Sequence, residues 1–296
     1  MNIPRVVVTG IGTVNPLGLN VEEFWEGLVA GKSGISFITR FDASNFHVKV
    51  DAEVKGFEPA KYMDLKVVDR TPRAVQLAIA AATEAVKSAG LDMTRECPER
   101  VGASIAAMVE SGYVVKQSEL INSRGPRRAD PLFVAKSSPS AASMQVGMML
   151  GAKGPNSSVN SLCASGADAI GTALNFIRLG YADVMVAGGA DSSLDQLGVA
   201  GVDVLGALSR EPDPAKASRP FDLNRNGFVY GEGSGIVVLE SYEHARSRGV
   251  TILAEIAGAG WSFDAYDQTA PAPEAEAYAI RTALQNAGVK LEEVAR

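Results

Sequence analysis

The stretch that decides the fold class runs from Ser158 to Gly189 and reads SVNSLCASGADAIGTALNFIRLGYADVMVAGG. Its first residues, 158–162, predict a short strand. Residues 164–179 predict a helix, because apolar side chains recur along one face at Ile170, Leu174 and Ile177. The apolar run at 184–187 predicts a buried strand that ends in two glycines. Strand, helix and strand in this order are typical of an α/β protein.

The same alternation continues on both sides of this stretch. Further strands are expected at 6–9, 47–54, 101–107, 235–240 and 252–257. Further helices are expected at 21–30, 71–89, 138–150, 242–248 and 274–286. Polar stretches without clear periodicity predict loops at 122–131 and 209–233. The pattern as a whole predicts an α/β fold with a largely parallel sheet, and Thr71 is expected to cap the helix that follows it.

Composition excludes several classes of function. The chain has 296 residues, and 28 basic against 34 acidic side chains give a net charge of −6. This balance argues against sequence-independent binding to nucleic acid or to anionic membranes. Two cysteines and two histidines are too few for a disulfide scaffold or for most metal sites, so we expect no metal. No apolar stretch approaches the ~18 residues of a membrane span, and we expect a cytoplasmic protein.

The N-terminal Gly10-Ile11-Gly12 is similar to a dinucleotide-binding turn but lacks its third glycine, since Asn15 stands there. Pro16 occupies the place where the phosphate-binding helix would begin. Without that glycine and a helix N-terminus there is no cradle for a pyrophosphate. We therefore favour a tight turn between a strand and a helix over nicotinamide binding.

Cys163 is the sharpest candidate for chemistry. It lies between a predicted strand and a predicted helix and is followed by the small residues Ala164, Ser165 and Gly166. Unpaired N–H groups and the dipole at a helix N-terminus stabilise a thiolate, and they also stabilise the oxyanion of a tetrahedral intermediate. A buried structural cysteine is an equally good interpretation of the local sequence. Cys97, in a charged loop, is interpreted as structural or incidental.

A cysteine nucleophile normally needs a base, and only His47 and His244 are available. One lies in an alternating strand and the other on a charged helix, so both are expected to be solvated. The loop around Phe228 is either a surface turn with Asp222 paired to Arg225, or a segment that packs beside the nucleophile with Phe228 as an apolar wall. Spacing alone does not decide between them.

These residues together resemble the β-ketoacyl-acyl-carrier-protein synthases that elongate fatty acids. The resemblance covers the whole chain and is carried by five segments in order: 6–18, 162–166, 186–190, 219–235 and 264–271. It implies a thiolase-like fold with α-β-α-β-α layers, usually a homodimer. Residues 1–250 would form the N-terminal half with the nucleophile, and residues 251–296 would begin a C-terminal half that is incomplete.

The resemblance also implies an activity. Cys163 would take an acyl group from the phosphopantetheine arm of an acyl carrier protein and condense it with malonyl-acyl-carrier protein, with its own backbone N–H in the oxyanion hole. No bound cofactor is implied, because the substrates arrive on that arm. The implied substrate pocket includes Met108, Val202, Phe228 and Thr269, and the loop near 122–130 would lie by the dimer interface or acyl tunnel.

Several positions depart from the family. Two catalytic histidines and a lysine of the family's C-terminal half have no match in His47 or His244, so we expect the chain as given to accept an acyl group without condensing it. Four further differences suggest a divergent member or altered acyl specificity: Leu162 for Ala, Asp168 for His, Asn226 for Asp and Asp267 for His.

Two alternatives stay open. The first alternative to a synthase is a non-catalytic partner subunit, which the retained Cys163 argues against. The second is another thiolase-fold acyltransferase, such as a polyketide ketosynthase or a thiolase. An incomplete second half would also leave apolar faces uncovered, which predicts poor solubility.

Overall fold

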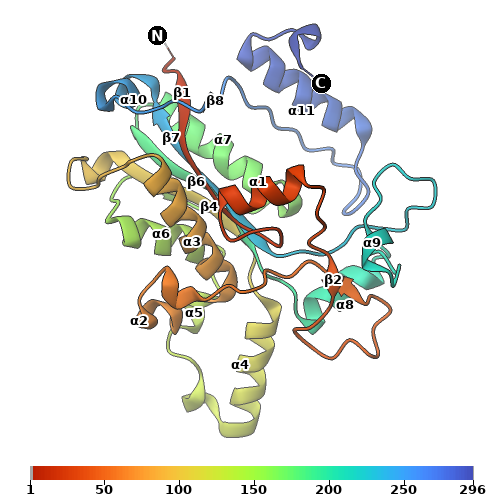
Figure 1. Ribbon diagram of the computed structural model, residues 1–296. Helices are drawn as coiled ribbons and strands as arrows, with labels where there is room; N and C mark the ends of the chain where they lie inside the picture. The colour runs from red at the N-terminus through yellow and green to blue at the C-terminus, as the bar shows by residue number, and fades with distance from the viewer. Residues whose placement is uncertain (1–2, 296) are drawn as a thin grey trace.

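Helices cover both faces of one mixed β-sheet in the computed structural model, which describes residues 3–295 (Figure 1). The sheet strands are β1 (Val6–Val14), β4 (Val101–Ala107), β5 (Asn156–Ser157), β6 (Val184–Asp191), β7 (Gly233–Ser241) and β8 (Ala254–Glu255). A separate two-stranded sheet is formed by β2 (Ser36–Phe37) and β3 (Val50–Asp51).

The helices alternate with these strands along the chain. They are α1 (Val21–Val29), α2 (Leu65–Val68), α3 (Arg73–Ser88), α4 (Ser111–Arg124), α5 (Phe133–Lys136), α6 (Ala141–Leu150), α7 (Ser165–Arg178), α8 (Gln196–Val204), α9 (Pro214–Ala217), α10 (Tyr242–Arg248) and α11 (Pro273–Ala287). Short 3₁₀ turns are η1 (Pro59–Lys61), η2 (Pro98–Arg100), η3 (Pro126–Arg128), η4 (Leu162–Ala164) and η5 (Leu291–Glu293). No helix within residues 3–295 combines the length and the apolarity that a membrane span needs.

Two cores lie on opposite faces of the sheet. Successive side chains of a strand point to opposite faces, so β6 contributes to both cores. Val184 and Val186 belong to the core under α3 and α6, whereas Met185 and Ala187 belong to the core under α7. A strand that is buried on both faces needs a continuous apolar run, which is what residues 184–187 provide.

The expectation of a largely parallel sheet is wrong. The strand order is β5-β4-β6-β7-β1-β8, and within residues 3–295 the parallel pairs are β4 with β5 and β4 with β6. β7 is antiparallel to β6 and to β1, and β8 is antiparallel to β1. The helix α7 carries the chain back across the sheet between β5 and β6, which makes those strands parallel. The long connection from β6 to β7 leaves and re-enters the sheet at the same end of the strands, which makes that pair antiparallel.

The glycines near the N-terminus do not form a turn, because β1 continues through them to Val14. A Cβ at Gly10 would lie 2.1 Å from the carbonyl oxygen of Ala85, and one at Gly12 would lie 2.1 Å from that of Ala81. The two glycines therefore allow α3 to lie directly against the strand, and the prediction of a tight turn is wrong. Gly258 and Gly260 repeat this arrangement against α11, where a Cβ would lie 2.5 and 2.2 Å from helix carbonyl oxygens.

Several predicted elements differ from the structure. The expected strands at 47–54 and 252–257 shrink to the two-residue strands β3 and β8, and 158–162 leads into a 3₁₀ turn and not into a strand. The loop expected at 122–131 begins inside helix α4, which runs from Ser111 to Arg124. Thr71 does not cap α3, because Pro72 occupies the N-cap position and the Thr71 hydroxyl donates to the carbonyl of Val67.

Candidate active site

Cys163 opens into a cavity of about 300 Å³ at the end of the sheet where β4 and β6 finish and β7 begins. Carboxyl ends of neighbouring parallel strands are the usual place for a ligand site in an α/β sheet. The cavity is lined by Ala106, Ala107, Met108, Leu162, Cys163, Ser165, Gly166, Gly189, Ala190, Asp191, Gly233, Ser234 and Gly235. Most of these side chains are small, which leaves the thiol accessible.

Cys163 lies in the 3₁₀ turn η4, which runs directly into the first turn of α7. The predicted placement at a helix N-terminus is thereby confirmed, and the thiol is exposed. The first N–H groups of a helix have no carbonyl partner inside the helix, so they can stabilise negative charge beside the sulfur. The alternative of a buried structural cysteine is excluded by this exposure.

Two glycines bring the strands close to the nucleophile's helix. A Cβ at Gly189 would lie 3.3 Å from the Cα of Gly166 in α7. At Gly188 the backbone has φ +151°, and a Cβ would lie 2.1 Å from the carbonyl oxygen of Gly235. Side chains at these positions would push α7 or β7 away from β6. Gly189 lines the cavity, and Gly188 next to it allows β7 to lie directly against β6.

Asp191 lines the cavity with Cys163, and Tyr230 packs against the neighbouring cluster of Val48, Val199 and Leu208; sequence reasoning missed both. Burial raises the pKa of Asp191 above its ordinary value, although hydrogen bonds from Ser193 oppose the shift. Burial, followed by the charge of Asp191, raises the pKa of Tyr230, and Cys163 contributes to the same shift. The only signal in the sequence is that Asp191 follows two glycines at a strand end.

Glu232 lies directly before the cavity-lining residues Gly233 to Gly235 and anchors them through a buried hydrogen-bond network. Its side chain is fully buried and accepts from Arg73 (Nε 2.8 Å, Nη2 2.8 Å), Arg40 (2.7 Å), Ser192 (2.6 Å) and the backbone N–H of Val54 (2.9 Å). Burial would raise the pKa of Glu232, but these donors and the two guanidinium charges hold it below its ordinary value. The next residues along the chain, Gly233 to Gly235, line the cavity.

Asp51 lies near this network without joining it. The residue is fully buried, and neither carboxylate oxygen hydrogen-bonds to a group within residues 3–295. Burial, together with the charge of Glu53, raises the pKa of Asp51 from 3.8 to about 7. The carboxyl group therefore stays protonated through the acidic range in the folded chain.

Replacing Asp51 by alanine is expected to stabilise the fold at alkaline pH. Between pH 4 and pH 7 the unfolded chain releases the Asp51 proton while the folded chain retains it, so the free energy of unfolding falls as pH rises. A shift from 3.8 to about 7 corresponds to on the order of 4 kcal/mol. Urea denaturation at pH 4.5 and pH 8 should show Asp51→Ala gaining on the wild type at the higher pH. The exposed control Asp64→Ala should show no such gain, and an equal effect of Asp51→Ala at both pH values would contradict the account.

The four residues that the resemblance placed in the substrate pocket lie at different places. Met108 lines the cavity with Cys163. Phe228 is about half exposed and bonds through its backbone to Ala207 and Ser209. Val202 packs against the cluster of Val48, Val199 and Leu208. Thr269 donates through its backbone N–H and its hydroxyl to Asp267. Of the four, Met108 alone is among the residues that line the cavity.

Neither histidine is among the residues that line the cavity. His47 is exposed and faces Asp203 at 3.5 Å. The expectation that His244 is solvated is wrong, because its Nδ1 lies 2.6 Å from Glu240 and its Nε2 lies 2.9 Å from Glu96. The hydrogen bond with Glu240, and then both carboxylate charges, raise the pKa of His244. The surface-turn alternative for the loop around Phe228 paired Arg225 with the Asp222 carboxylate, whereas in the structure Arg225 donates to the backbone carbonyl of Asp222.

Comparison with known proteins gives this site a family. The family model for the beta-ketoacyl synthase N-terminal domain matches residues 4–245. The 3-oxoacyl-[acyl-carrier-protein] synthase 2 of Coxiella burnetii is 42% identical over 294 residues, which cover 98% of this chain and 71% of that protein.

Solved structures agree with the sequence comparison. A β-ketoacyl synthase from Burkholderia phymatum is 32% identical, with a TM-score of 0.90 over 99% of this chain and 72% of that one. A ketosynthase described in complex with its type II acyl-carrier protein, AntDE:AntF, is 32% identical, with a TM-score of 0.85 over 98% of this chain and 71% of that one. These similarities confirm the expected thiolase-like α/β fold, and the chain belongs to the β-ketoacyl synthase family.

Proposed function

We propose that this chain is a β-ketoacyl-acyl-carrier-protein synthase of the type that elongates fatty acids. The observation that carries the proposal is Cys163, which is exposed at the N-terminus of α7 and opens into a cavity at the carboxyl ends of β4 and β6. The relatives named 3-oxoacyl-[acyl-carrier-protein] synthase 2 support the same reaction. A non-catalytic partner subunit is disfavoured, because it would have no use for an accessible thiol at this place.

The first half of the reaction is a thioester exchange. The Cys163 thiolate attacks the carbonyl carbon of an acyl group carried on phosphopantetheine. The carbonyl oxygen becomes an oxyanion, which the N–H groups at the start of α7, including that of Cys163, would stabilise. The bond from the carbonyl carbon to the phosphopantetheine sulfur then breaks. The leaving thiolate takes up the proton that Cys163 gave up, and the acyl group stays on Cys163.

The second half is a condensation. A malonyl group on a carrier loses CO₂, its carbanion attacks the acyl carbonyl on Cys163, and the Cys163 thiolate leaves. The family resemblance assigns this half to two histidines and a lysine, which His47 and His244 do not match by position. The residues around Cys163 support acyl transfer directly, and the complete condensation is proposed from family membership. No resident cofactor enters either half.

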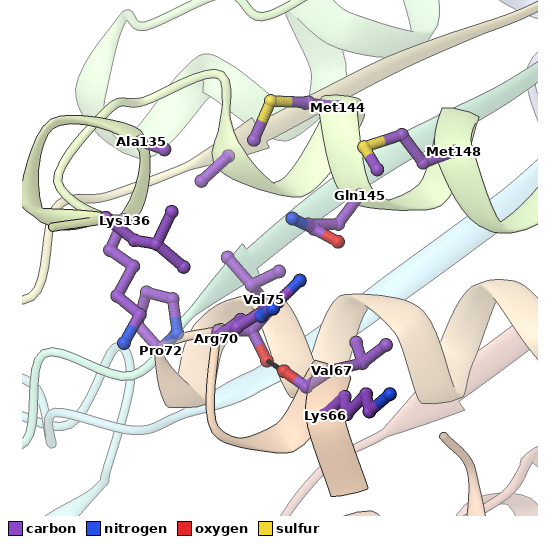
Figure 2. A pocket seen from close by; sticks show the side chains of 13 residues that line it. Lys66, Val67, Arg70, Pro72, Val75, Ala135, Lys136, Met144, Gln145 and Met148 are labelled. Carbon is purple, nitrogen blue, oxygen red and sulfur yellow. Dashed lines mark hydrogen bonds between the residues drawn. The ribbon is translucent and has the colours of Figure 1, made fainter. Parts of the chain in front are cut away.

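We propose that the carrier binds beside the groove shown in Figure 2, a hollow of about 280 Å³ between the α2 segment and α6. Lys66 and Arg70 are exposed on one side of the groove, and Met144 and Met148 lie across from them. The Lys136 ammonium lies at the end of the groove and bonds to Asp130 at 2.7 Å. Phosphopantetheine carries a phosphodiester, so cations beside an apolar groove suit a carrier that presents this arm.

A comparison of donors tests this proposal. With one acyl group on acyl carrier protein, on CoA and on neutral N-acetylcysteamine, loading of the wild type should be fastest from the carrier protein. Lys66→Glu with Arg70→Glu should slow loading from the carrier about tenfold or more, because two cations become anions at the docking face. Loading from the neutral thioester should change less than twofold. The control Lys87→Glu, at the exposed end of α3, should leave all three rates unchanged.

Two outcomes would count against the proposal. Equal or faster loading from CoA would favour the thiolase-type alternative over a carrier-dependent synthase. A double variant that loads from the carrier as fast as the wild type would place the docking face elsewhere. A polyketide ketosynthase would instead prefer β-keto acyl groups over saturated ones on the same carrier.

We also propose a cytoplasmic homodimer. β5 lies at one edge of the sheet and pairs on one side with β4, so its outer edge offers backbone groups to another strand. A second copy in the opposite direction would continue the sheet across a two-fold axis.

For the domain organisation we propose the division into 1–250 and 251–296. The glycine pair 258/260, which packs against α11, repeats the glycine pair 10/12, which packs against α3, and this repetition supports a second unit that starts after residue 250.

A further inference from the structure

The turn that carries Cys163 is strained. Leu162, directly before the cysteine, has φ +55°, a left-handed conformation that a leucine rarely adopts. Its side chain is 65% exposed, so packing does not hold it in place. A strained residue persists only where surrounding groups fix it. The position of the Cys163 sulfur therefore depends on the hydrogen bonds around Leu162.

Two serines supply the nearest of these bonds. The Ser165 hydroxyl donates to the carbonyl of Leu162 at 2.7 Å and accepts from the backbone N–H of Ser161 at 2.8 Å. Ser165 is the first residue of α7, so this pair ties the strained turn to the start of the helix. Ser161, on the other side of Leu162, has a backbone of φ −127° and ψ 34° that is neither helix nor strand.

Asp168 provides the second tie. The Ser161 hydroxyl donates to the carboxylate of Asp168, which lies in the first turn of α7. Hydrogen bonds therefore fix the strained Leu162 from both sides. The Ser165 hydroxyl binds the Leu162 carbonyl, and Asp168 binds the side chain of the preceding residue, Ser161. A carboxylate accepts a hydrogen bond more strongly than a neutral polar side chain does, because the bond is charge-assisted.

We propose that Asp168 is a positioning residue for acyl transfer, which acts by accepting the Ser161 hydroxyl and so fixing the turn that presents Cys163. It touches neither the acyl group nor the reacting sulfur. The inference rests on the proposed function of Cys163 as acyl acceptor. It also gives a role to a position at which this chain departs from its family resemblance.

Two explanations of Asp168 are separated by a matched pair of variants. Asp168→Asn keeps an oxygen that can accept the Ser161 hydroxyl but removes the negative charge. Asp168→Ala removes both. If the hydrogen bond positions the turn, the asparagine restores most of the rate that the alanine loses. If the charge acts through space on the sulfur, the two variants behave alike.

The experiment measures acyl loading of Cys163 from acyl-N-acetylcysteamine in Asp168→Ala, Asp168→Asn, Ser161→Ala and the Asp168→Ala/Ser161→Ala double variant. Each alanine variant should load about tenfold more slowly, since a misplaced nucleophile loses rate at the reacting atom. The double variant should be no slower than either single variant, because both remove the same bond. Asp168→Asn should stay within about threefold of the wild type, with thermal midpoints alike throughout.

Alkylation of Cys163 by iodoacetamide is measured on the same variants. If the wild type accepts no acyl group, the proposed function fails, and the same ranking in alkylation rate still supports the positioning role. Multiplicative losses in the double variant, or an asparagine as slow as the alanine, would overturn it. A loss that follows a lowered thermal midpoint would show Asp168 to be structural only.

Discussion

Replacing Glu232 by alanine is expected to lower the free energy of unfolding by about 3–5 kcal/mol. The carboxylate is fully buried and is the shared acceptor for the guanidinium groups of Arg40 and Arg73. Removing it leaves two partly buried cations without a carboxylate partner, although Arg40 still donates to the Ser192 hydroxyl and Arg73 to the carbonyl of Val54. An unpaired charge inside a protein costs far more than the pair itself contributes.

The same variant should disturb the site. Glu232 directly precedes the cavity-lining residues Gly233 to Gly235. Its bonds to Val54, Arg73 and Ser192 therefore tie three other segments to the cavity wall. Urea denaturation gives the stability, and acyl loading at a temperature where the variant stays folded gives the effect on the site. The control is Glu58→Ala, whose exposed pair with Lys61 at 2.9 Å is screened by solvent, so this variant should leave the free energy of unfolding almost unchanged. A Glu232→Ala variant within about 1 kcal/mol of the wild type would contradict this account of the network.

Cys163→Ala is expected to reduce acyl loading at least about a thousandfold while the fold stays intact. An alanine methyl group cannot form a thioester, so the variant has no sulfur at position 163 to accept the acyl group. Because the thiol is exposed, its loss leaves no internal void, and the thermal midpoint should move by less than about 2 °C. Intact-mass spectrometry after incubation with acyl carrier protein measures the loading.

Cys97 supplies the matched control for this substitution. It is also exposed, and its thiol donates a hydrogen bond to the Glu99 carboxylate at 3.5 Å, outside the cavity that Cys163 lines. Cys97→Ala should load at the wild-type rate. Loading that survives in Cys163→Ala would show that another residue accepts the acyl group.

The long periodic elements could be predicted from the sequence. Helix α7 was expected at 164–179 and lies at Ser165–Arg178, because its apolar face and terminal glycine are local signals. The buried strand β6 followed from its apolar run, although it continues through both glycines to Asp191. Strand direction could not be predicted, because alternation of helix and strand does not say at which edge of the sheet a long connection ends.

Short and weakly amphipathic elements were missed for a different reason. Helix α4 begins with Ser111 and Gly112, which are poor helix formers, and Asp195 of the loop before α8 accepts from both residues. This contact comes from residues far along the chain, so no local pattern signals it. The strand expected at 252–257 is present but shorter, because Ala254 and Glu255 are the residues of it that pair with β1.

The candidate site divides in the same way. The order of strand, cysteine, small residues and helix was enough to single out Cys163. The buried groups around it were not predictable, because Glu232 and Asp191 meet their partners only in the folded chain. The glycines 10 and 12 show the limit most clearly: they were interpreted as a turn, and their role is to let α3 approach the sheet.

The central claim is that Cys163 accepts an acyl group from a carrier, and peptide mapping tests it most directly. The wild-type protein is incubated with acyl carrier protein bearing a saturated acyl group, digested without reducing agent, and analysed by mass spectrometry. The account predicts one acyl group, on the peptide that contains Cys163, while the Cys97 peptide stays unmodified. An acyl group on the Cys97 peptide, or none on either cysteine, would contradict it.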